Sequence, residues 1–312
     1  MSTVLKPPWL WAWVGAGAVW LATALFTGGT GSTQVLSAAL TFGAFYVIVA
    51  LGQMFVITLG PGNVDLSIPA CMTLAGTVSM KVMDGAAAML PVGLVLALLI
   101  GLGVGTINFA LIRLLRIPPI IATLSSSFIF QSAAIWYNRG LRVKPPEPLA
   151  DFTTAKIAGV PIIALAVAAL AVAMHLLLTR TIYGRAVLAI GQNQRAAHLA
   201  GIKVERTRAL TYLMCATLAG LCGFLLAGFS GGAALNMGEE YLLSSIAVVV
   251  IGGTSVAGGY SNVPGLWGAA LFLFLLVTML NTFGAGAGVR MVLTGLIIIG
   301  VIVAASGGRK RT

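Results

Sequence analysis

Charged side chains are scarce in this sequence, and acids are the scarcest among them. The 312 residues include seven Asp and Glu, two His and three Cys, and charged residues make up 8% of the chain. Soluble domains contain about 25% charged residues, so the composition excludes an ordinary soluble protein. It also leaves too few titratable side chains for an active-site cluster, so we expect no catalytic residue and no cofactor bound by this chain.

Other absences narrow the function further. The three cysteines, Cys71, Cys215 and Cys222, lie inside apolar segments without metal-ligand spacing, so we expect small buried side chains. His175 and His198 have no paired ligand at metal spacing, and the sequence therefore predicts no metal site. The chain contains no GxxxxGK[ST] motif, which excludes a nucleotide phosphate-binding loop of that type.

Apolar residues are what the sequence has in abundance. They make up 59% of the chain, the mean hydropathy is +1.04, and apolar runs of 17 or more residues recur. Each run can cross a hydrocarbon core of about 30 Å. We therefore predict an all-α polytopic membrane protein, with residues 1–312 forming a single transmembrane domain. The expected spans, about ten, are 9–27, 35–59, 64–80, 88–115, 119–137, 160–178, 209–229, 241–258, 265–281 and 289–305.

The first apolar run, from Trp9 to Phe26, has two interpretations. It follows a weak basic region that contains only Lys6, so it could be a signal peptide. It is long for a signal peptide, however, and it holds four Trp without a clear small-x-small cleavage site. These features favour a retained membrane helix.

The net charge is +11, and the basic residues gather in short segments between the apolar runs. This distribution is typical of residues that set membrane orientation, and it does not indicate nucleic-acid binding. Segment 179–208 holds six Arg and Lys against Glu205, so we place it in the cytoplasm. The span count then places both termini there, including the basic tail Arg309 to Arg311. Loop 138–159 falls outside, although it also carries four basic residues: Arg139, Arg142, Lys144 and Lys156.

The two halves of the chain show the same order of features. Segments 35–137 and 209–305 each read as a span, a Gly-rich break, a short span and a long span that ends in Asn, offset by about 173 residues. Five spans separate equivalent positions, so this pattern predicts an inverted repeat with broken helices. The expected helix breaks are at Gly60 and Gly62 in the first half and at Gly252 and Gly253 in the second, and "SGGAALNMG" at 230–238 also interrupts an apolar run. In the second half, "GGTSVAGG", with Gly252 and Gly253, is better explained by a turn or close packing than by a phosphate cradle.

Neutral polar residues within the spans are candidates for lining a pathway. They could equally form hydrogen bonds between helices. The one acid that the sequence places close to a span is Asp65, which could either line the pathway or cap the short helix that follows, with Ser67 helping. The candidate pathway residues are Gln53, Asp65, Asn108, Ser125, Gln131 and Asn281.

The polar segment 190–208 contains a short helix-forming stretch that ends at Gly201. Its mixture of small and basic side chains suits close approach by an acidic partner, and an interfacial helix on anionic lipid would also fit. The segment resembles the coupling loop of ribose-type sugar ABC importer permeases, which has the form EAA, three residues, then G. The residues on that spacing, together with a neighbouring histidine, are Arg195, Ala196, Ala197, His198 and Gly201, with Arg195 standing where the family usually has Glu.

The resemblance extends along residues 43–305. "VITLGPGNVDLSIP" is similar to the family's "GGIDLSVG" region, and "LRIPPIIATLSSSFIFQ" and "SIAVVVIGGTSVAGG" also resemble family segments. Leu242 and Ser244 depart from the Glu and Asp found in ribose permeases, so ribose is not carried over. The resemblance implies a permease subunit of the bacterial inner membrane. Its expected partners are a second permease subunit, identical or paralogous, a separate ATPase chain that uses ATP, and a solute-binding protein.

The expected function is therefore the membrane pathway of an ATP-binding-cassette importer for a neutral, hydroxyl-rich solute, with a monosaccharide as the expected class. The alternative is an ion-coupled secondary transporter of a small polar solute, which would also have inverted repeats but needs buried acids or an ion cage. A membrane enzyme is a further alternative, and it lacks the cluster of reactive side chains that it would need.

Overall fold

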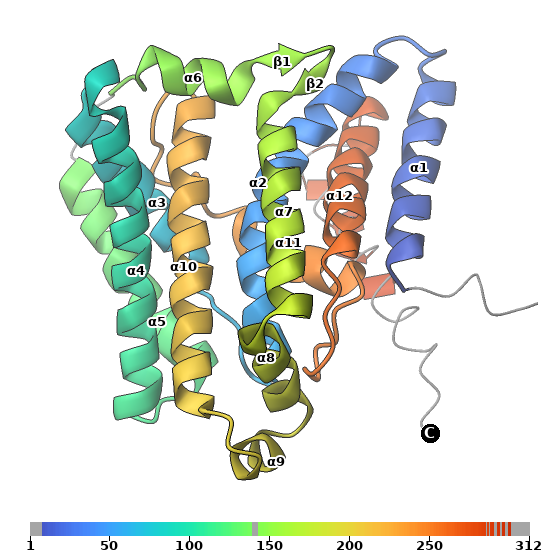
Figure 1. The fold of residues 1–312 in the computed structure, drawn as a ribbon. Helices are drawn as coiled ribbons and strands as arrows, with labels where there is room; N and C mark the ends of the chain where they lie inside the picture. The colour runs from blue at the N-terminus through green and yellow to red at the C-terminus, as the bar shows by residue number, and fades with distance from the viewer. Residues whose placement is uncertain are drawn as a thin grey trace, which may run out of the picture.

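Membrane-length helices dominate the structure. The computed structural model describes residues 8–138, 143–284, 286, 288–289, 292–293, 295–296 and 299–300. Seven helices there are long and apolar enough to cross a membrane: α1 (Pro8–Phe26), α2 (Ser32–Thr58), α4 (Leu90–Leu114), α5 (Pro119–Asn138), α7 (Ile162–Arg180), α10 (Val204–Phe229) and α12 (Pro264–Thr282). They run side by side as one bundle (Figure 1). The multi-pass helical fold is confirmed, whereas the count of ten spans is not.

Two of the expected spans are shorter helices. Residues 64–80 correspond to α3 (Ile68–Met83), and residues 241–258 correspond to α11 (Tyr241–Ile251). At about 1.5 Å per residue these helices reach roughly 24 Å and 17 Å, less than a bilayer core of about 30 Å. The expected last span, 289–305, lies largely outside the described residues, as does the basic tail.

The limits of the short helices follow from their sequences. Before α3 the chain turns at Gly60 and Gly62, which have φ values of +121° and +80°, and Pro69 favours the first turn of the new helix. After α11, Gly252 caps the helix and Gly253 has a φ of +93°, so the helix cannot continue to residue 258 as the hydropathy predicted.

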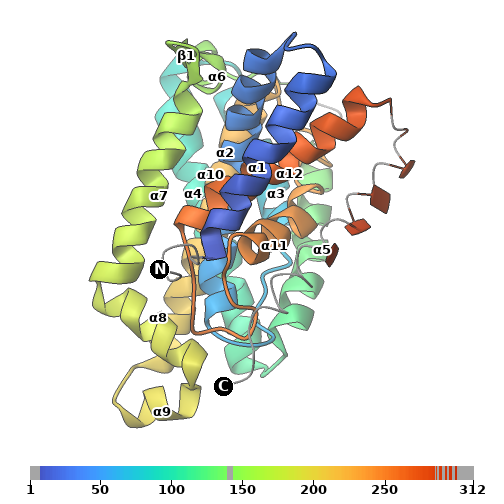
Figure 2. The same cartoon turned by 90° about the vertical axis from the view of Figure 1, so that its right-hand side faces the viewer.

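The remaining elements lie at the two ends of the bundle (Figures 1 and 2). Helices α8 (Ile182–Gln192) and α9 (Gln194–Leu199) extend beyond one end. The opposite end holds α6 (Glu147–Thr154) and a two-stranded hairpin of β1 (Lys156–Ile157) and β2 (Val160–Pro161). The 3-10 turn η1 (Ala87–Met89) leads into α4. Segments 179–208 and 143–159 therefore lie at opposite ends, as their predicted placement on opposite sides of the membrane requires; Arg139 and Arg142 lie outside the described residues.

Helices α2 and α10, the first long helices of the two halves, run in opposite directions. Helix α2 descends to the α9 end, where the Gly259 amide donates to the Thr58 carbonyl at 3.0 Å, and α3 then returns toward the end that holds α6. Helix α10 instead rises from α9, and α11 lies across the middle of the bundle and leads into the loop 252–263.

Small residues bring α4 and α10 into close contact. A Cβ atom built on Gly101 would lie 2.6 Å from Thr217 Cα, and one on Gly105 would lie 2.7 Å from Leu213 Cα. On α10, a Cβ on Gly220 would lie 2.5 Å from the Ala97 carbonyl oxygen. Membrane helices associate through such close packing, because the hydrophobic effect does not favour helix–helix contacts over helix–lipid contacts.

A matched pair of substitutions tests this contact. We expect Gly101→Val to lower the melting temperature in detergent, because overpacking a tight contact costs about 1–3 kcal/mol. Gly103→Val on the same helix should have little effect, because a Cβ there meets nothing within 4 Å. Equal melting temperatures for the two variants would contradict close α4–α10 packing.

Candidate functional site

A buried polar network lies where the chain turns between α2 and α3. The Asp65 Oδ1 atom accepts from the Ser67 amide at 2.9 Å and from the Ser67 hydroxyl at 2.6 Å. Asn108 on α4 donates from Nδ2 to Ser67 Oγ at 2.7 Å, and Ser126 on α5 donates to Asn108 Oδ1 at 2.5 Å. The network therefore joins three segments around one carboxylate.

The same network provides hydrogen-bond acceptors for two backbone amides that are not part of a helix. The Asp65 amide donates to Gln53 Oε1 on α2 at 3.2 Å, and the Leu66 amide donates to Thr123 Oγ1 on α5 at 3.0 Å. Non-helical backbone at membrane depth requires such partners. Asp65 Oδ2 and Gln53 Nε2 are buried without a hydrogen-bond partner among the described residues.

Five of the six candidate pathway residues are either buried or exposed, and Gln131 is half-buried. Gln53, Asp65 and Asn108 are at most 1% exposed, so a solute does not reach them in this conformation. Ser125 and Asn281 are exposed, Ser125 on α5 and Asn281 at the last turn of α12. The structure thus brings Gln53, Asp65 and Asn108 together but not Ser125 or Asn281.

The contacts of Asp65 are those of a residue that holds a turn, and a role in the pathway stays a prediction. Asp65 holds the turn that precedes α3, while Ser67 occupies the N-cap position without a side-chain cap hydrogen bond. The run Ser125 to Ser127 drew attention as neutral polar residues, but the list of candidate pathway residues included Ser125 and neither Thr123 nor Ser126. A spacing of four from Ala122 through Ser126 and Phe130 to Ala134 marks the buried face of α5 and could have distinguished Ser126 from Ser125.

The second turn, residues 230–240, crosses the middle of the bundle between α10 and α11 (Figure 2). Gln131 on α5 donates from Nε2 to the Leu235 carbonyl at 2.7 Å. A Cβ on Gly238 would lie 2.7 Å from Pro69 Cα, so this turn packs against the first turn of α3. The N-terminal ends of the two short helices therefore meet inside the bundle.

Two exposed acids stand at this meeting point. Glu239 and Glu240 directly precede α11, and neither takes part in an ion pair of the described residues. The Glu240 carboxylate interacts electrostatically with Tyr46, the fifteenth residue of the 27-residue helix α2. The Tyr46 and Tyr241 rings lie 5.1 Å apart, which also sets this site near half depth. Sequence reasoning missed both acids, although they directly precede a predicted span.

Glycines join three segments at the α9 end of the bundle. A Cβ on Gly258 would lie 2.4 Å from Gly60 Cα, and one on Gly191 would meet the Thr58 carbonyl and the Gly259 amide. Gln192, the last residue of α8, donates from Nε2 to the Gly259 carbonyl at 3.4 Å. The loops that follow α2 and α11 thus contact the segment that carries α9.

Helix α9 is an isolated projection beyond this junction (Figure 2). Asn193 Oδ1 caps it by accepting from the Ala196 amide at 3.0 Å, and Gly201, with a φ of +82°, closes its C-terminal end. Arg195, Ala196 and His198 are exposed, whereas Ala197 packs inward. Leu199 is 81% exposed, a feature that sequence reasoning also missed.

An open hollow of about 400 Å³ lies beside α9. Its lining combines apolar and charged side chains, which suits contact with another protein better than contact with a small ligand. The lining residues are Gln194, His198, Gly201, Ile202, Lys203, Val204, Glu205 and Arg206.

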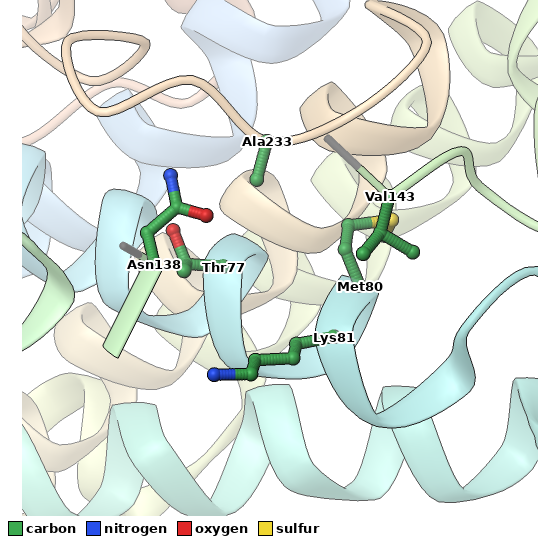
Figure 3. Close-up of a pocket in the computed structure, with 6 residues that line it drawn as sticks. All are labelled: Thr77, Met80, Lys81, Asn138, Val143 and Ala233. Atoms are coloured by element: carbon green, nitrogen blue, oxygen red, sulfur yellow. The ribbon is translucent and has the colours of Figure 1, made fainter. Parts of the chain in front are cut away.

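A second hollow, at the opposite end, is too small for a solute. Its volume is about 10 Å³, and Thr77, Lys81 and Asn138 supply its polar lining (Figure 3). This is roughly the room for one water molecule. Lys81 Nζ donates to the Tyr137 carbonyl at 2.8 Å and lies 4.0 Å from the centre of the Tyr137 ring, which fixes α3 to α5.

Comparison with known proteins identifies the architecture. Residues 35–302 match the family described as the branched-chain amino acid transport system / permease component. The chain belongs to this family. It is therefore a transport subunit rather than an enzyme, and a multi-pass protein of the inner membrane.

Similar proteins include two kinds of import permease. Ribose import permease RbsC of Bacillus subtilis (strain 168) is 32% identical over 263 residues, which is 81% of this chain and 78% of the relative. Autoinducer 2 import system permease LsrC of Enterobacter sp. (strain 638) is 30% identical over 274 residues, 87% and 79% of the two chains. RbsC of Escherichia coli (strain K12) is 28% identical, covering 81% and 79%. No solved structure matches the chain significantly.

Substitutions of Asp65 test whether the network stabilises the first turn. Asp65→Ala leaves the Ser67 amide and hydroxyl without their acceptor, which should cost about 1–3 kcal/mol and lower the melting temperature. Asp65→Asn retains an Oδ1 acceptor and should lower the melting temperature much less. Ser125→Ala, on the exposed side of α5, is the control. Equal losses for Ala and Asn at position 65 would contradict a structural role for this acceptor.

Proposed function

We propose that this chain forms the translocation pathway of an ATP-binding-cassette importer for a neutral, hydroxyl-rich solute, with a monosaccharide as the expected class. The observation that carries the solute class is similarity over about four fifths of the chain to permeases named for ribose and autoinducer 2. The paired acids at the centre support it, because carboxylates accept hydrogen bonds from hydroxyl groups and repel an anionic solute.

The pathway, in this proposal, passes the meeting point of α3 and α11. Ionisable side chains at membrane depth face a water-filled cavity or the interior of a bundle. Glu239 and Glu240 are exposed on the described chain near the level of Tyr46, so the surface that carries them requires a wet lumen. Leu243, 73% exposed on the same short helix, extends this surface.

A second permease subunit would close the lumen on its open side. An exposed acid pair at half depth cannot face lipid at low cost, so a partner that lines the other wall is required. We propose a homodimer or a heterodimer with a paralogue as the source of that wall. The candidate lining also includes Ser125, which is exposed on α5, the helix joined to the second turn through Gln131.

An inverted repeat would account for the paired short helices. The halves 35–137 and 209–305 each contain a long helix, a turn, a short helix and a further helix in the described residues, and their first long helices run in opposite directions. Gly60 and Gly62 then stand in the break of the first half, and Gly252 and Gly253 follow the short helix of the second. Transporters place solute sites where such halves meet.

The α9 end would receive the ATPase. Helix α9 presents Arg195, Ala196 and His198 outward, with the apolar Leu199 at its tip and the 400 Å³ hollow beside it. A small-residue helix next to a hollow allows close docking. This orientation places α9 and the Pro8 end of α1 in the cytoplasm, and a solute-binding protein would meet the opposite end, at α6 and the hairpin.

Gly201 offers a test of ATPase docking. Its φ of +82° is unfavourable for a β-branched residue but acceptable for Asn. We expect Gly201→Val to reduce ATPase binding and ATP-driven uptake by about tenfold, because strain of about 1–2 kcal/mol would distort the end of α9. Gly201→Asn should retain both. Unchanged ATPase binding in the Val variant, measured by co-isolation from detergent, would argue against docking at α9.

Glu240 offers a test of the pathway. We expect Glu240→Gln to raise the solute concentration needed for half-maximal uptake by about tenfold, as on losing one hydrogen bond to a charged group. The amount of bound ATPase should not change. Glu240→Asp, which keeps a carboxylate at this position, is the control. An identical concentration dependence in both variants would place Glu240 outside the pathway.

A further inference from the structure

The first turn is tied to α10 through one buried amide. Asn63 is 8% exposed, and its Oδ1 atom accepts from Arg208 Nη2 at 3.3 Å and from the Tyr212 hydroxyl at 3.1 Å. Its Nδ2 donates to the Gly60 carbonyl at 3.2 Å. Asn63 therefore fixes residues 60–63 to α10, two positions before Asp65.

Arg208 also connects this amide with the hollow beside α9. Its Nη1 atom lies 3.9 Å from Glu205 Oε1, and Glu205 lines the hollow. The other carboxylate oxygen of Glu205 lies 3.0 Å from Arg113 Nε at the end of α4. One continuous polar chain thus runs from the hollow through Glu205 and Arg208 to Asn63.

The placement of Arg208 is unusual for a basic residue near the cytoplasmic end of a membrane helix. Such side chains usually extend toward water. The Arg208 side chain is only 17% exposed and points back to the turn, whereas the Glu205 and Arg113 side chains are 45% and 54% exposed. An exposed pair contributes little to stability, so Arg113–Glu205 is the part of the chain that a docking partner can rearrange.

We infer that Arg208 is a positioning residue that transmits occupancy of the α9 hollow to the first turn of the pathway. This inference rests on the proposed function, because the occupant is the ATPase. A partner group that engages Glu205 changes the charge facing Arg208. The guanidinium then redistributes its hydrogen bonds between Glu205 and Asn63, and residues 60–65 shift with it.

A labelling experiment on the permease–ATPase complex tests this inference without knowledge of the solute. Pro61→Cys places a thiol on the exposed part of the turn, and the native thiols Cys71, Cys215 and Cys222 are buried. The measurement is the rate of labelling by a fluorescent maleimide, with and without ATP and vanadate. We expect nucleotide to change this rate in the parent reporter.

Arg208→Gln should reduce the nucleotide-dependent change about tenfold, the factor expected on losing one hydrogen bond to a charged group. ATP hydrolysis and labelling without nucleotide should persist. Arg116→Gln removes one exposed positive charge from the same end and should keep the full response. If Arg208→Gln fails to fold, Tyr212→Phe is the substitute variant. It removes the second donor to Asn63 without a change of charge and should weaken the nucleotide response.

A double-mutant cycle separates transmission from general damage. Asn63→Ala should add no further loss to Arg208→Gln, because both act on one contact. A full nucleotide response in Arg208→Gln, or additive losses in the double variant, would overturn the inference and leave the proposed function intact. A parent complex without any nucleotide response would overturn the inference alone, whereas a chain that does not co-isolate with an ATPase would overturn the proposed function.

Discussion

Inside a membrane, every backbone amide and carbonyl needs a hydrogen-bond partner within the protein, and the structure depends on this constraint. Two segments of this chain, 59–67 and 230–240, leave the helix ladder within the bundle. Gln53, Thr123 and Gln131 supply side-chain partners to the Asp65 amide, the Leu66 amide and the Leu235 carbonyl. Without them each free group would cost several kcal/mol in an apolar medium. These long helices therefore serve as scaffolds for two short ones.

The short helices connect the centre of the molecule with its α9 end. Their N-terminal turns meet at Gly238 and Pro69. The loop that follows α2 and the loop that follows α11 pack against α8 through Gly60, Gly258 and Gly191. The polar chain of Glu205, Arg208 and Asn63 forms a second link between the same regions. A displacement of α9 can therefore be transmitted to the turn before α3 in two ways. One is through the backbone contacts at the glycines, and the other is through the contacts of Arg208 with Glu205 and Asn63.

Hydropathy predicted the membrane class and the long helices well, because a run such as Leu90–Leu114 needs only length and apolarity to be recognised. It failed at residues 252–258, where Gly252 and Gly253 end α11 although the run contains no charged residue. It also placed Asn108 and Asn281 as equivalents, yet Asn108 is buried against Ser67 whereas Asn281 is exposed. Burial depends on which face of a helix meets its neighbours, and hydropathy alone does not identify that face.

The acids Glu239 and Glu240 show a further limit of sequence reasoning. They look like the polar end of a span, and only the packing of their turn against α3 brings them to half depth. Arg208 looks like one more basic residue of a cytoplasmic segment. It contacts Asn63, which lies 145 residues away in the sequence, so local sequence patterns do not reveal this contact. Long-range contacts of this kind carry the proposed mechanism.

The most direct test of the account is the composition and activity of the complex isolated from its native membrane in mild detergent. The account predicts that an ATPase chain co-purifies with the permease in a fixed ratio and hydrolyses ATP, and that a solute-binding protein stimulates this hydrolysis. A permease that purifies without an ATPase and accumulates solute in liposomes on an ion gradient alone would contradict it.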